Sequence, residues 1–165
     1  MKEIRAFIRD HRETVLFQWK KESMEMFPEQ SRNVMQVKTD PFSNPIPHAL
    51  GKGIEMLVGD LCEDEENNLE KGLANLGRLL GVQDMPPSQS LSFFFKLRPL
   101  VCKLASRKRS KSIFPDDELH ELQLWVEQKM LRLFDQFMIH REKIYQMKGD
   151  EIKQRNYMLL RKSGQ

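Results

Sequence analysis

The sequence is poor in the residues that build disulfide scaffolds and structural metal sites. Only two of its 165 residues are cysteines, Cys62 and Cys102, and they lie far apart with no CxxC pair. This count and spacing argue against a disulfide framework and against a zinc ribbon. Both cysteines fall on apolar faces of predicted helices. We therefore expect reduced core thiols, with a redox-sensing pair as the alternative.

Long apolar runs and targeting signals are missing as well. No apolar stretch approaches the roughly 18–20 residues that a transmembrane helix needs. The first residues, MKEIRAFIRDHRET, are charged throughout and do not resemble a signal peptide. The sequence thus predicts a cytoplasmic protein with no membrane insertion.

Catalytic and metal-binding motifs also fail to appear. None of the four histidines, at positions 11, 48, 120 and 140, has another histidine three or four residues away. There is no HExxH, GxSxG or P-loop, and the Gly51-Lys52-Gly53 stretch lacks the third glycine of a dinucleotide-binding turn. We therefore predict that the chain is not an enzyme and needs no cofactor.

The charge balance gives little reason to expect a nucleic acid. Lys and Arg number 27 against 24 Asp and Glu, for a net charge of +3. The basic residues collect at 107–111 and at 141–162, without the interleaved exposed aromatic residues of a nucleic-acid surface. Such runs are usually solvated faces, so we predict no nucleic-acid partner.

What the sequence does contain is helical periodicity. Apolar residues recur at three- and four-residue spacing, and alternation with period two is almost absent. We predict an all-α bundle of about five to seven helices with a long C-terminal helix. A loop with four prolines is predicted at 28–47, and Pro99 is predicted to kink the fourth helix. The main predicted helices cover about 2–27, 45–61, 67–80, 93–104 and 114–162.

The last predicted helix is longer than a small domain is wide. At 1.5 Å per residue it extends about 70 Å, so its end is expected to protrude or to pack on a partner. We divide the chain into a helical body at 1–147 and a protruding end at 148–165. Basic residues at neighbouring positions make the helix a poor coiled coil alone, and Gly149 is a candidate break or hinge. Apolar residues recur every seven positions at Leu131, Met138, Tyr145, Ile152 and Leu159.

Methionine and phenylalanine are unusually frequent, with ten of each beside two Trp and two Tyr. Met fills irregular cores and adaptable interfaces because its side chain is flexible and polarisable. The excess therefore indicates either an adaptable core or a cavity for a small apolar ligand, and composition does not choose between them.

Three stretches together resemble a known family. They are Asp40-Pro41-Phe42-Ser43-Asn44-Pro45 followed by His48, the VQDMPPSQ stretch at 82–89, and the stretch at 134–153. In this order and spacing they resemble the RsbRD N-terminal domain family, over about residues 4–160. Members of that family are sensory modules of RsbT co-antagonist proteins, which belong to bacterial stress-signalling assemblies.

The resemblance implies a globin-like fold without haem, a homodimer formed through the terminal helix, and a regulatory function. Longer relatives continue into a STAS domain. This sequence ends at Gln165, so the chain is either a stand-alone sensor or a fragment, and a STAS-domain or other regulatory protein is an implied partner. Candidates for signal or partner contact are Asp40, Pro41, Phe42, Asn44, Pro45, His48, Gln83, Asp84, Ser88 and Gln89. Candidates for the dimer and transmission helix are Leu131, Met138, Arg141, Tyr145, Ile152 and Leu159.

An alternative function is a ligand- or haem-binding redox or gas sensor with a globin-like fold. Its candidate iron ligands are His11 and His140. His11 lies on an apolar stripe, where a histidine with a local hydrogen bond is the simpler interpretation.

Overall fold

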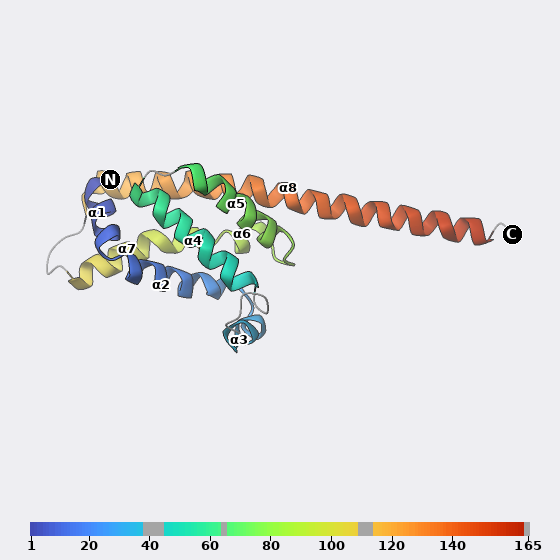
Figure 1. The fold of residues 1–165 in the computed structure, drawn as a ribbon, viewed down its shortest axis with the longest axis horizontal. Helices are drawn as coiled ribbons and strands as arrows, with labels where there is room; N and C mark the ends of the chain where they lie inside the picture. The colour runs from blue at the N-terminus through green and yellow to red at the C-terminus, as the bar shows by residue number, and fades with distance from the viewer. Residues whose placement is uncertain (38–44, 64–65, 109–113, 164–165) are drawn as a thin grey trace.

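Helices make up nearly all of the described chain in the computed structural model (Figure 1). The structure describes residues 1–37, 45–63, 66–108 and 114–163. These ranges contain no strand, so the predicted all-α bundle with a long C-terminal helix is confirmed. In order, the elements are α1 (Lys2–Asp10), α2 (Arg12–Ser23), the 3-10 turn η1 (Met24–Met26), α3 (Glu29–Val37), α4 (Pro45–Glu63), α5 (Glu66–Gly81), α6 (Pro87–Ser90), α7 (Phe94–Lys108) and α8 (Asp116–Ser163).

The core forms where the apolar stripes of six helices meet. Trp19 of α2 packs against Phe93, and its indole Nε1 donates a hydrogen bond to the Phe93 carbonyl oxygen at 2.9 Å. Each large apolar side chain removed from water contributes roughly 1.5–3 kcal/mol, so these stripes hold the bundle together. Fully buried side chains include Ile4, Ile8, Trp19, Ile54, Leu57, Leu61, Leu69, Leu73, Phe93, Phe94 and Phe137.

Glycine lets α5 approach α8 closely. A Cβ atom on Gly77 would lie 2.6 Å from the Cβ atom of Gln136 and 2.9 Å from its carbonyl carbon. A Cβ atom on Gly81 would lie 3.1 Å from the Cβ atom of His140. The backbone of α8 cannot move aside as the end of a flexible side chain can. Position 77 therefore requires glycine if the two helices are to keep this separation.

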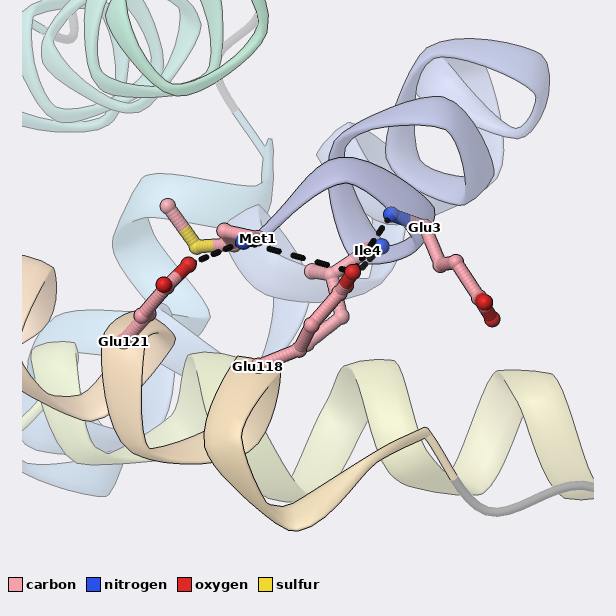
Figure 2. A network of polar contacts seen from close by, with 5 residues as sticks. All are labelled: Met1, Glu3, Ile4, Glu118 and Glu121. Carbon is pink, nitrogen blue, oxygen red and sulfur yellow. Dashed lines mark hydrogen bonds and ion pairs between the residues drawn. The ribbon is translucent and has the colours of Figure 1, made fainter.

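The first turn of α8 anchors the first turn of α1 (Figure 2). The Glu118 carboxylate accepts hydrogen bonds from the backbone N–H of Glu3 at 3.0 Å and of Ile4 at 2.9 Å. The amino group of Met1 forms an ion pair with Glu121. Because the free N–H groups at the start of a helix favour a negative charge, Glu118 caps α1 from a distant part of the sequence.

A buried ion pair joins α4 to α8. The Lys129 ammonium lies 2.8 Å from Oδ2 of Asp60, and the Trp125 indole donates a hydrogen bond to the same oxygen at 3.0 Å. Lys129 and Asp60 are 6 % and 4 % exposed. Each charge is thus removed from water and stabilised by its partner, and the pair fixes α4 against one stretch of α8.

The predicted continuous helix at 2–27 is wrong at one point, because the chain bends at His11. The backbone there leaves the helical region, with φ −119° and ψ 23°, and the His11 Nδ1 atom lies 2.9 Å from the Phe7 carbonyl oxygen. The bend lets α1 pack on α4 and α8 while α2 packs on α4 and α7. One straight helix could not reach both sets of neighbours, and apolar spacing alone does not reveal the bend.

The predicted loop at 28–47 is also partly wrong. Residues Glu29–Val37 form α3, which follows Pro28, and α4 begins at Pro45 as predicted. Proline is well placed at a helix start because the first turn needs no N–H donor there. The four prolines suggested one long loop, yet none of them falls within α3.

The C-terminal helix is continuous through Gly149 and extends far beyond the body (Figure 1). The candidate break at this glycine is therefore not present. From Tyr145 to Arg161 every residue except Gly149 is exposed. α7 likewise runs through Pro99, which lies on an exposed position.

Candidate functional site

The clearest concave site lies between α4 and α5. It is a groove of about 530 Å³ whose two walls come from the two halves of this antiparallel helix pair. Close approaches between Gly53 and Leu76, and between Gly72 and Met56, set the register of the pair. The lining residues are Pro45, His48, Ala49, Lys52, Gly53, Met56, Gly72, Asn75, Arg78, Leu79 and Val82.

Two glycines shape the floor of this groove. A Cβ atom on Gly53 would lie 2.8 Å from Cδ2 of Leu76, and one on Gly72 would overlap the sulfur atom of Met56. Both glycines are buried, so each leaves room for a side chain from the opposite helix. Larger residues at these positions would push Leu76 and Met56 into the space of the groove.

The polar lining is basic at one end. His48 and Lys52 lie one turn apart on α4, and Arg78 faces them from α5, while none of the described residues that line the groove is a carboxylate. The register of the helix pair places Arg78 nearer to His48 and Lys52 than to Met56. All three basic side chains are exposed, so they can bind a solute without first breaking a buried contact.

Hydrogen bonds from Arg141 connect the turn at this basic end to α8. The Gln83 side chain donates to the Leu79 carbonyl oxygen at 3.1 Å. Arg141 of α8 donates to the carbonyl oxygens of Gln83 and Met85, both at 2.8 Å. Its guanidinium also lies 4.9 Å from the centre of the Phe137 ring. A shift of the turn after α5 would therefore act directly on α8.

His140 precedes Arg141 on α8, and its pKa depends on nearby positive charges that include Arg78 of the groove. Burial lowers the pKa of His140, and the positive charges of Lys143 and Arg78 lower it further. Arg78 therefore acts on both the groove and α8. A negative charge bound near Arg78 would weaken its effect on the His140 imidazole.

The α8 stripe is the second candidate surface. We use this name for Leu131, Met138, Tyr145, Ile152 and Leu159, the residues predicted from seven-residue spacing. Four of them are about 60 % exposed, and Met138 is half-buried. Leu124, 44 % exposed, continues the stripe by one interval toward the start of α8 and was not predicted.

The structure brings together only some of the motif residues. Pro45 and His48 line the groove, and Gln83 lies at its end in the turn that Arg141 binds. Asp84 is exposed in the same turn. Ser88 and Gln89 belong to α6, where the Gln89 side chain donates to the Met26 carbonyl oxygen at 2.5 Å, a bond within the fold. Asp40, Pro41, Phe42 and Asn44 lie outside the described residues.

The sequence did not reveal the two strongest charges of the groove. Lys52 and Arg78 stand in ordinary amphipathic helices, with no motif around them. Their only sequence signal is a basic residue beside glycines, which is common on helix surfaces. Helix packing alone places the two side chains on one groove.

The two candidate haem ligands are far apart. His11 stacks on Phe7 with ring centres 4.4 Å apart, and Phe7 in turn packs on Phe114, just before α8 begins. His140 lies 24 residues beyond Asp116 in α8, which is about 36 Å along a straight helix. The structure therefore does not bring His11 and His140 to one site.

Comparisons with known proteins identify no relative of this chain. No family model, curated protein or solved structure matches the chain. Across the described ranges, no three His, Cys, Asp or Glu side chains are grouped so that they could hold a metal ion. In the same part of the chain, no helix combines the length and apolar character needed to cross a membrane.

Proposed function

We propose that the chain is a non-enzymatic regulatory domain that senses a signal in its helical body and reports it through α8. The observation that carries this proposal is the α8 stripe, four of whose five residues are about 60 % exposed, and the protrusion of the end of α8 from the body (Figure 1). A monomer has no packing reason to place a tyrosine, an isoleucine and a leucine in water at a seven-residue spacing. A partner helix would bury them.

In this proposal the partner is a second copy of the chain. Burying Tyr145, Ile152 and Leu159 of both copies would contribute roughly 10 kcal/mol before the costs of association. Gly149 lies between Tyr145 and Ile152 with no atom within 4 Å of the position its Cβ would take. That open position lets another backbone approach closely, which supports helix–helix pairing.

The groove and the hydrogen bonds of Arg141 would connect a bound signal to the position of α8. A change at the α4–α5 groove would move the turn that Arg141 binds, and thereby shift or rotate α8 against its partner. The resemblance to RsbRD N-terminal domains agrees with this arrangement. It also makes a STAS-domain or other regulatory protein in a bacterial stress response the downstream partner, in the cytoplasm.

Sedimentation velocity tests the dimer. We expect the purified chain to be a dimer at about 10 μM, a concentration that corresponds to roughly −7 kcal/mol of association free energy. Ile152→Lys places a charge in the α8 stripe and is expected to give a monomer. Gln154→Lys adds the same side chain on the opposite face of α8 and is expected to remain a dimer. A wild-type monomer at this concentration, or a dimer in the Ile152→Lys variant, would refute the homodimer.

A further inference from the structure

We propose that the α4–α5 groove binds a small amphiphilic anion, a single-chain carboxylate such as a fatty-acid anion. This inference rests on the proposed sensory function, because it names the chemical class of the signal. Three observations carry it: the size of the groove, its apolar floor and the basic residues at one end.

The groove has the dimensions and lining of a small-molecule site. Its volume of about 530 Å³ falls within the range of roughly 300–1,000 Å³ that ligand pockets occupy. Met56, Leu79 and Val82 supply apolar contact, and Val82 is 56 % exposed. An alkyl chain laid between α4 and α5 along Leu79 and Val82 would cover these two side chains and remove them from water.

The charges give the ligand a direction. Lys52 and Arg78 gather toward one end of the groove, where His48, Leu79 and Val82 also lie, while Met56 and Gly72 occupy the other end. A carboxylate at the basic end can accept hydrogen bonds from the Arg78 guanidinium and the Lys52 ammonium. The alkyl chain would then extend toward Leu79 and Val82. A neutral lipid or a cation would leave the basic end without a counter-charge.

The same charges disfavour the end of α8 from a second copy of this chain as the occupant of the groove. In the protruding end of α8 from a second copy, Lys148, Lys153 and Arg155 outnumber Asp150 and Glu151, so this segment brings no net negative charge to the groove. Placing that segment in a groove lined by Lys52 and Arg78 would set like charges against each other. A small anion satisfies the lining and the α8 stripe remains available for dimerisation.

Isothermal titration calorimetry with decanoate, below its micelle concentration, tests the proposal on the full chain. We expect saturable binding of one decanoate per chain and at least tenfold weaker binding of decanol, which has the same alkyl chain without the charge. Lys52→Glu and Arg78→Glu are each expected to weaken decanoate binding at least tenfold. Lys71→Glu reverses a charge on exposed α5 surface outside the groove and is expected to change affinity less than twofold. Ala49→Trp fills the groove and is expected to abolish binding, with thermal unfolding confirming that the variant is folded.

Several results would overturn the proposal. These are the absence of saturable decanoate binding, equal binding of decanol, or equal weakening by Lys71→Glu and Lys52→Glu. Binding only to anionic phosphatidylglycerol vesicles or to polyglutamate, without decanoate binding, would assign the basic end to a membrane surface or to an acidic peptide instead. Sedimentation of the same samples separates the two proposals. A monomer that binds decanoate refutes the homodimer alone, and a dimer that does not bind it refutes the ligand alone.

Discussion

Replacing Lys129 with methionine is expected to destabilise the fold strongly, because it leaves the Asp60 carboxylate buried without its cation. The Lys129 Nζ atom lies 2.8 Å from Oδ2 of Asp60. At an effective dielectric constant of about 20, two unit charges at that separation attract by about 6 kcal/mol. Desolvation of the two ions offsets much of that attraction in the intact pair.

Removing one partner leaves the desolvation cost of the other. Breaking a buried ion pair in this way typically costs about 3–5 kcal/mol, which in a chain of this size lowers the melting temperature by about 10 °C. The double variant Asp60→Asn with Lys129→Met removes both charges and retains an oxygen that accepts the Trp125 N–H. It is expected to recover most of the loss.

Urea unfolding at pH 7 measures these free energies, with far-UV circular dichroism and tryptophan fluorescence as two probes of one transition. Trp125 donates its N–H to Asp60, so its fluorescence also reports on the local change. The reasoning is refuted if Lys129→Met loses less than about 1 kcal/mol. It is equally refuted if the double variant loses as much as the sum of the two single variants, because the pair would then show no coupling.

Two further perturbations follow from the packing of α8. Gly77→Ala is expected to lose about 1–3 kcal/mol in urea unfolding, because the new Cβ atom would lie 2.6 Å from that of Gln136. The matched Gly59→Ala, whose new Cβ atom would have its nearest neighbour at 3.9 Å, is expected to gain up to about 1 kcal/mol, and equal effects would contradict the close approach at Gly77. For Glu118, burial raises the pKa, but hydrogen bonds from Glu3 and Ile4 and the nearby amino terminus outweigh it and hold the pKa below its ordinary value of 4.5. The native state then binds fewer protons than the unfolded state, so stability present above pH 4.5 is lost as pH falls through the native pKa. Glu118→Gln is expected to reduce this loss of unfolding free energy at acid pH, measured by urea unfolding at several pH values. An unchanged pH dependence would exclude Glu118 as its source.

Several helices could be predicted because their signals are local. Proline at position 45 marks the start of α4, and Gly81 ends α5 where the sequence predicted it. Pro115 followed by Asp116 indicates the start of α8, and no later proline interrupts it. Capping, proline geometry and apolar spacing act within one turn of helix, so a single sequence is enough to read them.

The features that the sequence did not predict arise where segments distant in the chain determine the local structure. The bend at His11 exists because α1 and α2 pack against different neighbours, and α3 forms within a window whose prolines suggested a loop. Asp60 and Lys129 carry no sequence signal of a pair, because ordinary charged residues on amphipathic helices are normally exposed. The same holds for Lys52 and Arg78, which only the antiparallel packing of α4 and α5 places together.

The sequence by itself determined that this protein is helical, that its last helix outreaches the body, and that the α8 stripe repeats every seven residues. These properties depend on spacing along one chain segment, which backbone geometry converts directly into a face or a length. Only the tertiary structure decided which charges are buried, where the groove opens and how Arg141 connects it to α8. Those properties depend on the distance and register between helices, and side-chain packing across each interface sets both.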